Sequence, residues 1–172
     1  NTILTGHLTY RTIGSAGKAV SMGSYDISVS RALNVSFISC SQTNDMNDRR
    51  YWGILGSNYC KNLLYDNCTL SRFDAHKGVA NATIRNSTLG HMGINAIDSG
   101  TLSVENTTIQ GRSLINLRSD YGSTWQGEIF IRNCVFVPAG GRSTSAALIS
   151  GFYSGQHDFG YTRYMPERIT IE

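Results

Sequence analysis

Nine residues, Asn81-Ala-Thr-Ile-Arg-Asn-Ser-Thr-Leu89, contain the pattern that decides the fold of this chain. Apolar and polar side chains alternate from Ala82 to Arg85, which is typical of a β-strand that buries one face. Asn86 follows, and asparagine tolerates the left-handed backbone conformation that a tight corner needs. The next residue, Ser87, is small and fits an inward position at such a corner. The stretch therefore predicts a short strand that ends in an asparagine turn.

The same pattern recurs along the chain, and its copies align without gaps. They start at positions 34, 62, 81, 101, 128 and 168, and the last copy stops at Glu172. The shorter intervals resemble one minimal coil of a parallel β-helix, and the longer ones resemble a coil with an inserted loop. The corner position and the small residue after it are Ser39-Cys40, Asn67-Cys68, Asn86-Ser87, Asn106-Thr107 and Asn133-Cys134. Stacked corners are expected to join these amides in a hydrogen-bonded ladder.

A second apolar strand is expected in each coil, and no segment shows the sustained 3.6-residue period of a helix. The sequence thus predicts an all-β fold, a single-stranded right-handed parallel β-helix. A β-sandwich also has short alternating strands, but it does not predict one corner motif at near-constant intervals. The second strands are expected around Ile54-Leu55, Ala96-Ile97, Leu114 to Leu117 and Ala147 to Ile149.

We expect residues 1–172 to form one β-helix domain that is a fragment of a longer chain. The first residue is Asn1 rather than methionine, and the final strand pattern is interrupted at Glu172. Loop insertions are predicted at about 42–52 and 138–166, and they carry several aromatic and charged residues that suit a binding surface or a subunit contact.

Composition narrows the class of protein. Charged residues make up 16% of the chain, below the roughly 25% usual in soluble domains, and the net charge is only +3. Dense clusters of lysine and arginine are missing, which argues against nucleic acid as a partner. No apolar run reaches the roughly 18 residues of a membrane span. The uncharged polar surface that this composition predicts favours an extracellular, cell-surface or virion location.

The cysteines are interpreted as architectural. Cys40, Cys68 and Cys134 share one repeat position, where a buried small side chain is favoured, and a disulfide between Cys40 and Cys68 is the alternative. Cys60 lies outside this register. No spacing of cysteine and histidine suits zinc, so neither a metal nor another cofactor is expected.

Taken together, the coils from about residue 26 to residue 172 resemble the pectate-lyase-like superfamily of right-handed parallel β-helices. That superfamily includes polysaccharide lyases, glycoside hydrolases and viral tailspikes. The resemblance rests on coil architecture, and the chain carries no catalytic signature of a single family. It implies a polysaccharide as the partner, and a homotrimer if the protein is viral.

Candidate site residues follow the corners of the central coils. Arg72, His91 and Arg112 are expected to form one polar row along the axis, with one residue per coil about 4.8 Å apart. A second row beside it is expected to contain His76, Asn95 and Asn116. We assign a catalytic role to Arg72, Asp74, His76 and His91, and a substrate-binding role to Lys77, Asn95, Arg112, Asn116 and Trp52.

These residue types suit two reactions on a sugar polymer. A lyase needs a base beside a uronate carboxylate and a cation that stabilises the enolate. A hydrolase needs two carboxylates, for which Asp74 is the first candidate and Asp48 or Asp98 the second. The structural alternatives are a surface ion-pair cluster for Arg72, Asp74 and His76, a corner cap for His91 and a turn residue for Asp98.

The sequence leaves two classes of function open. The first is an extracellular carbohydrate-active β-helix that binds and cleaves a polysaccharide, as a lyase or a glycoside hydrolase. The second is a non-catalytic stalk or receptor-binding segment of a phage tailspike or bacterial adhesin.

Overall fold

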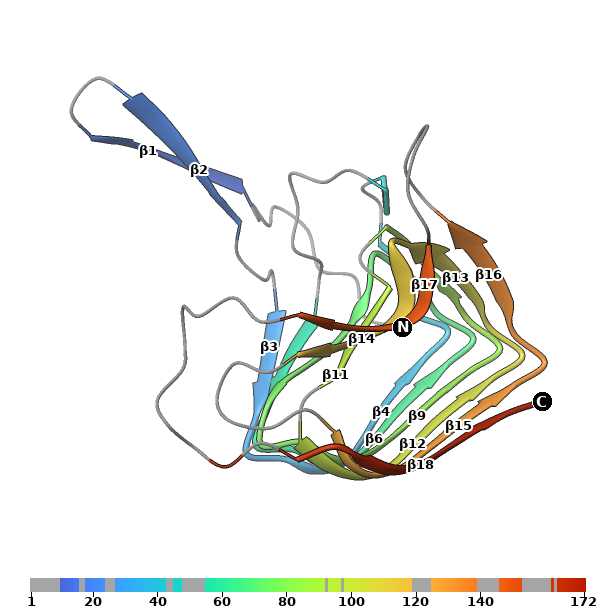
Figure 1. Cartoon of the computed structure of the whole chain (residues 1–172). Helices are drawn as coiled ribbons and strands as arrows, with labels where there is room; N and C mark the ends of the chain where they lie inside the picture. Colours follow the sequence, from blue (N-terminus) through green and yellow to red (C-terminus); the bar gives the residue numbers. More distant parts are fainter. Residues whose placement is uncertain are drawn as a thin grey trace.

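The fold of the chain is known from a computed structural model. It describes residues 10–15, 18–23, 27–42, 45–47, 55–91, 93–96, 98–118, 125–138, 146–152, 162 and 164–172. Every regular element in these ranges is a β-strand, and three parallel sheets stack coil upon coil (Figure 1). The described part of the chain contains no helix that is long and apolar enough to cross a membrane. The predicted all-β parallel β-helix is thus confirmed.

One six-stranded sheet, the repeat sheet, consists of the strands that carry the repeated pattern. Its order is β18-β15-β12-β9-β6-β4, so strands neighbour one another in the order of the coils. Val35 pairs with Leu63, Leu63 with Ala82, and so on through every copy to Ile169, which confirms the gapless alignment. The strands are β4 (Leu33–Ile38), β6 (Lys61–Asp66), β9 (Ala80–Arg85), β12 (Asp98–Glu105), β15 (Trp125–Arg132) and β18 (Pro166–Ile171).

Two further parallel sheets complete the coils. The second sheet has the order β17-β14-β11-β8-β5-β3, and the short sheet has the order β16-β13-β10-β7. The second sheet contains β3 (Ile27–Ser30), β5 (Leu55–Asn58), β8 (Phe73–Lys77), β11 (Ile94–Ala96), β14 (Ser113–Arg118) and β17 (Ala147–Phe152). The short sheet contains β7 (Thr69–Leu70), β10 (Thr88–Leu89), β13 (Thr108–Gly111) and β16 (Val135–Pro138).

Strands β1 (Tyr10–Ser15) and β2 (Lys18–Gly23) pair with each other in an antiparallel sheet. Strand β17 lies inside the insertion predicted at 138–166 and pairs with β14, so that stretch contains a strand of the coils. Of the insertion predicted at 42–52, the structure describes only residue 42 and residues 45–47.

The predicted corners adopt the left-handed conformation. The φ angles of Ser39, Asn67, Asn86, Asn106 and Asn133 lie between 47° and 55°. Part of the expected ladder is present, since Asn67 donates to Ser39 and Asn106 to Asn86, but Asn86 donates to Asp66 instead of Asn67. A second asparagine ladder, which the sequence reasoning missed, joins Asn34, Asn62 and Asn81 at the start of the repeated strands.

The residue after each corner asparagine or serine points inward and donates a hydrogen bond to the carbonyl two residues before it. Cys68 Sγ reaches the carbonyl of Asp66 at 3.4 Å, and Thr107 Oγ1 reaches that of Glu105 at 2.8 Å. All four cysteines are free. The position therefore requires a small side chain that also donates, which explains why cysteine, serine and threonine replace one another there.

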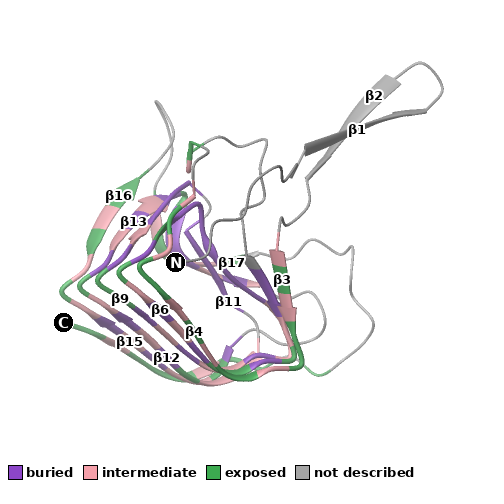
Figure 2. Cartoon of the chain, turned by 180° about the vertical axis from the view of Figure 1, so that it is seen from behind, coloured by how far each residue is buried: buried purple, intermediate pink, exposed green. Residues whose placement is uncertain are grey.

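The interior of the coils is apolar and closely packed. Figure 2 shows the buried residues along the strands of the parallel sheets. Tyr65 stacks edge-on against Phe37 and Phe73, with ring centroids 5.2 Å and 5.1 Å apart. Trp125 is fully buried and its indole Nε1 donates to the carbonyl of Gly100 at 2.9 Å. This rigid interior fixes the side chains on the outer side of each sheet.

Candidate functional site

A ladder of polar side chains crosses the outward side of the second sheet. Asp74 pairs in register with Asn95, Asn95 with Asn116, and Asn116 with Ser150. Asn116 Nδ2 donates to Asn95 Oδ1 at 3.0 Å, and Ser150 Oγ donates to Asn116 Oδ1 at 3.3 Å. Side chains alternate along a strand, so the neighbouring row of Phe73, Ile94, Ile115 and Ile149 faces the core.

The prediction placed His76 in one row with Asn95 and Asn116, and this is wrong. The register places Asp74 in that row instead. The prediction counted a near-constant number of residues from the corner to the second strand. From the aligned Leu70, Leu89 and Ile109, the aligned Phe73, Ile94 and Ile115 follow after three, five and six residues. The connection between the short sheet and the second sheet thus varies in length, and a fixed offset fails.

Three charged side chains form a cluster at one end of the ladder. Arg72 Nη2 lies 2.8 Å from Asp74 Oδ2, and Arg118 Nη1 lies 3.4 Å from Asp74 Oδ1. The side chain of Asp74 is 0% exposed, that of Arg72 is 6% exposed and that of Arg118 is 19% exposed. Arg72 and Asp74 thus form an ion pair, as the structural alternative expected, but the pair is buried rather than part of a surface cluster.

The three described side chains of this cluster carry two positive charges and one negative charge. Burial lowers the pKa of Arg72 to about 9, and the charge of Arg118 acts in the same direction. Arg72 still remains protonated at neutral pH, so Asp74 is paired with two guanidinium groups. Such a site favours an incoming anion, and arginine binds carboxylates through paired hydrogen bonds.

His76 lies on the same outward side as Asp74, two residues further along β8, as the alternation predicts. Its Nδ1 is 2.9 Å from Oδ1 of Asn58 on the neighbouring strand β5. An amide oxygen only accepts, so Nδ1 carries the proton and Nε2 is the basic nitrogen of the neutral ring. His76 is half-buried, which leaves part of the ring at the surface.

The structure does not support the predicted first row of Arg72, His91 and Arg112. Arg72 directly precedes Phe73 and so corresponds to Gly93, which directly precedes Ile94. His91 is 9% exposed, and its Nδ1 lies 3.0 Å from the carbonyl of Met46. Arg112 is exposed. Arg72 and His91 therefore have different partners and are not equivalent positions in the stack.

The contact between His91 and the carbonyl of Met46 holds part of the insertion predicted at 42–52 against the coils. The carbonyl of Met46 also lies so close to Gly90 that a Cβ at this position would collide with it. The main-chain contact thus requires glycine at position 90 and a hydrogen-bond donor at position 91. This anchoring role differs from the corner cap that was the alternative for His91.

The other candidates lie elsewhere or outside the described residues. Asp98 has a φ angle of 106° at a corner, and its Oδ2 accepts from the backbone N–H of Val79 at 3.0 Å, as a turn residue does. Burial raises the pKa of Asp98. Lys77 is half-buried at the end of β8. Trp52 and Asp48 fall outside the residues that the structure describes.

Sequence reasoning missed Arg118, Asn58 and Ser150. Arg118 lies two residues after Asn116 on the same strand, so the period of two already places it on the same face. Ser150 holds the position of Asn116 in the next coil. Within the described ranges, no group of three histidine, cysteine or acidic residues is arranged to hold a metal ion.

Comparisons with known proteins reveal a distant relative among phage enzymes. No family model matches the chain, and no solved structure matches it significantly. The chain is 27% identical over 121 residues to a capsule KL64-specific depolymerase of Klebsiella phage P510. This alignment covers 63% of the chain but 12% of the length of that protein. The chain is thus a parallel β-helix with distant and partial similarity to a phage capsule depolymerase.

Proposed function

We propose that this chain is part of a virion-associated, tailspike-like protein that binds and degrades a capsular polysaccharide. The observation that carries the proposal is the polar ladder with its excess of arginine on the outward side of the second sheet. The similarity to a phage capsule depolymerase supports the same class of substrate. Regular strands hold the ladder rigidly, and rigid elements position binding groups better than loops do.

The chemistry of the ladder suits an acidic sugar chain. Asn95, Asn116 and Ser150 supply donors and acceptors in a row that follows the axis of the coils, which suits the repeated hydroxyl groups of a polymer. Arg118, the more exposed of the two clustered guanidinium groups, is placed to bind a uronate carboxylate. We assign Arg112 and Lys77 to the outer parts of the same surface.

Elimination fits the described residues better than hydrolysis does. On this face, the described residues include one carboxylate, Asp74, which is fully buried between two arginines. A hydrolase needs two accessible carboxylates, whereas a lyase needs a base and a cation. We assign the base to His76 Nε2 and the stabilisation of the enolate to Arg118, with Arg72 and Asp74 holding Arg118 in position.

The test uses the intact parent protein and a panel of purified capsular polysaccharides, with the KL64 capsule as the first member. Unsaturated uronate, detected by ultraviolet absorbance, marks elimination, and new reducing ends without it mark hydrolysis. We expect His76→Ala and Arg118→Met to lower the rate at least about 100-fold, consistent with loss of a general base or of one stabilising charge. Arg85→Ala, on the repeat sheet, is the control that keeps the rate.

Two results contradict this assignment. If no capsule in the panel is bound or degraded, the proposed function is wrong. If a capsule is degraded at the same rate by His76→Ala and Arg118→Met, the activity resides elsewhere in the parent protein.

The second candidate is a receptor-binding segment without cleavage. The complete burial of Asp74 and its pairing with two arginines favour it over hydrolysis, because a hydrolase needs accessible carboxylates. This candidate predicts that the intact parent binds capsule without forming product. It also predicts a homotrimer, and light scattering that shows a monomer argues against it.

A further inference from the structure

The corner between the second sheet and the repeat sheet carries an unexpected residue. In three successive coils, the first residue of this corner is Arg31, Tyr59 and Gly78 in turn, and all three have positive φ angles. Glycine adopts such angles readily, whereas a positive φ is a true outlier for a bulky side chain such as tyrosine. Tyr59 has a φ of 52°, so the fold places a strained aromatic residue where glycine is sufficient one coil later.

The ring of Tyr59 lies at the surface between its neighbours in the stack. The residue is 49% exposed, and its ring packs against Gly78, where an added Cβ would lie 2.5 Å from Tyr59 Cδ1. The guanidinium carbon of Arg31 lies 5.5 Å from the centre of the ring, within the range of a cation–π contact. The N–H of Tyr59 donates to the carbonyl of Lys77 at 2.6 Å, which fixes the turn.

This aromatic corner adjoins the outward side of the second sheet. Asn58 directly precedes Tyr59 and holds His76 through the 2.9 Å hydrogen bond. A polymer that lies along the second sheet and contacts His76 thus reaches the corner next. The corner itself has a positive φ in each of these coils, so the strain comes from the choice of tyrosine, and residues strained in this way are often found at binding sites.

We propose that Tyr59 and Arg31 form a saccharide subsite, in which the exposed part of the Tyr59 ring contacts a sugar ring and Arg31, which lies over the ring, binds an acidic substituent. The inference rests on the proposed function and adds a binding position beyond the polar ladder. An aromatic ring binds the apolar face of a sugar, and the strained turn holds this ring without the loss of freedom that a flexible loop has on binding.

The test measures binding of acidic capsular oligosaccharides to the intact parent protein by calorimetry, with neutral maltohexaose for comparison. Tyr59→Asn removes the ring and suits the left-handed turn, as asparagine does at Asn34 and Asn62. We expect it to unfold at the same or a higher temperature and to bind the acidic oligosaccharides about tenfold more weakly. Tyr59→Phe keeps the ring and is expected to keep the affinity.

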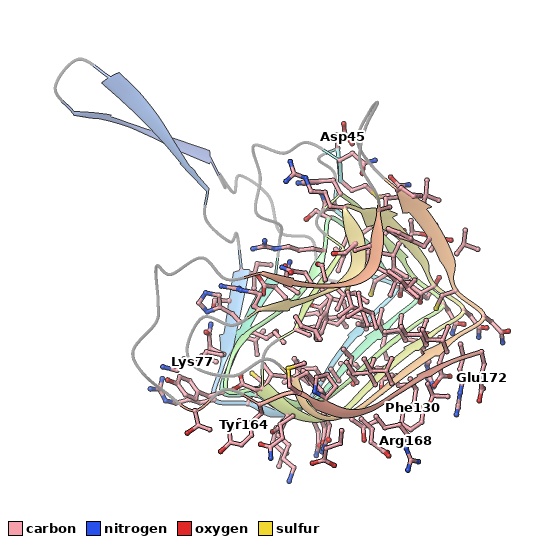
Figure 3. All side chains as sticks on the ribbon, in the orientation of Figure 1. Asp45, Lys77, Phe130, Tyr164, Arg168 and Glu172 are labelled. Atoms are coloured by element: carbon pink, nitrogen blue, oxygen red, sulfur yellow. The ribbon has the colours of Figure 1, made fainter. Side chains whose placement is uncertain are left out.

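A matched control is available in the repeat sheet. Arg132 lies 5.2 Å from the ring centre of Phe130, so the two form a similar pair on ordinary strand backbone. Figure 3 shows Phe130 on the outward side of that sheet. Lys77, whose carbonyl accepts from Tyr59, lies far from it, at the corner near β3. Phe130→Asn is expected to leave binding unchanged.

The outcomes separate this inference from the proposed function. If the wild-type protein binds acidic oligosaccharides and Tyr59→Asn binds them equally well, the subsite is wrong and the proposed function stands. The subsite is also wrong if Tyr59→Phe binds as weakly as Tyr59→Asn, because the ring then contributes nothing. If the wild-type protein binds no member of the panel, both are wrong.

Discussion

At the scale of single residues, the buried ion pair of Arg72 and Asp74 is the feature with the largest expected effect on stability. Removing one partner of a buried pair leaves an uncompensated charge, which costs about 3–5 kcal/mol. We therefore expect Asp74→Ala to destabilise the chain by about this amount in urea unfolding. The double variant Arg72→Met/Asp74→Ala is expected to recover part of the loss. A double variant that is less stable than Asp74→Ala contradicts this account.

The corner cysteines give a second prediction at this scale. Cys68 is 1% exposed and donates to the carbonyl of Asp66, and Ser87 makes the same bond in the next coil. Cys68→Ser is thus expected to change the free energy of unfolding little, whereas Cys68→Val loses the donor and costs about 1 kcal/mol. Equal stability of the two variants, measured by thermal unfolding, shows that only size matters at this position.

Sequence reasoning was most successful where a residue has the same environment in every coil. Asn67, Asn106 and Asn133 were placed correctly because a left-handed corner selects few residue types. It failed for the row of Asp74 and Asn95, whose relation depends on the length of an irregular connection. Sequence reasoning missed Arg118 because its partner Asp74 is 44 residues away in the chain, and only the stacking of the coils brings the two residues together.

At the scale of elements, the outward side of the repeat sheet has charges that alternate in sign from coil to coil. Asp66, Arg85, Glu105 and Arg132 are neighbours in register. Arg85 Nη2 lies 2.8 Å from Asp66 Oδ2, and Arg132 Nε lies 3.1 Å from Glu172 Oε2. Like charges opposite each other are destabilising, so this alternation favours the observed register over a shifted one.

This charge ladder makes stability depend on pH in the acidic range. Hydrogen bonds from Arg85 and Asn86 lower the pKa of Asp66 below its ordinary value of 3.8. A lowered pKa in the folded state means that the contribution is present above about pH 4 and is lost as the pH falls through the folded pKa. Arg85→Ala should therefore lose less stability than the wild type between pH 5 and pH 2, as followed by thermal unfolding. Parallel curves for the two proteins contradict this prediction.

At the scale of the whole molecule, each coil is stabilised mainly by the coils on either side. Ile84 and Ile171 belong to one inward row, yet Ile84 is 0% exposed in a central coil and Ile171 is 54% exposed at the end. We expect Ile84→Ala to cost about 2–5 kcal/mol and Ile171→Ala less than about 1 kcal/mol, measured by chemical unfolding of the 172-residue chain. Similar losses at both positions contradict a stability that depends on neighbouring coils.

The free thiols inside the corners have a consequence for experiments on this protein. Cys68 and Cys134 have pKa values raised by burial, and Cys60 and Cys68 are each 1% exposed. A thiol reagent therefore modifies Cys60 and Cys68 only after the surrounding coil opens. Cys134, which is nearer the last coil and half-buried, is expected to react before Cys68. The rate of alkylation at each buried native cysteine, followed by mass spectrometry, therefore measures how fast the coil around it opens.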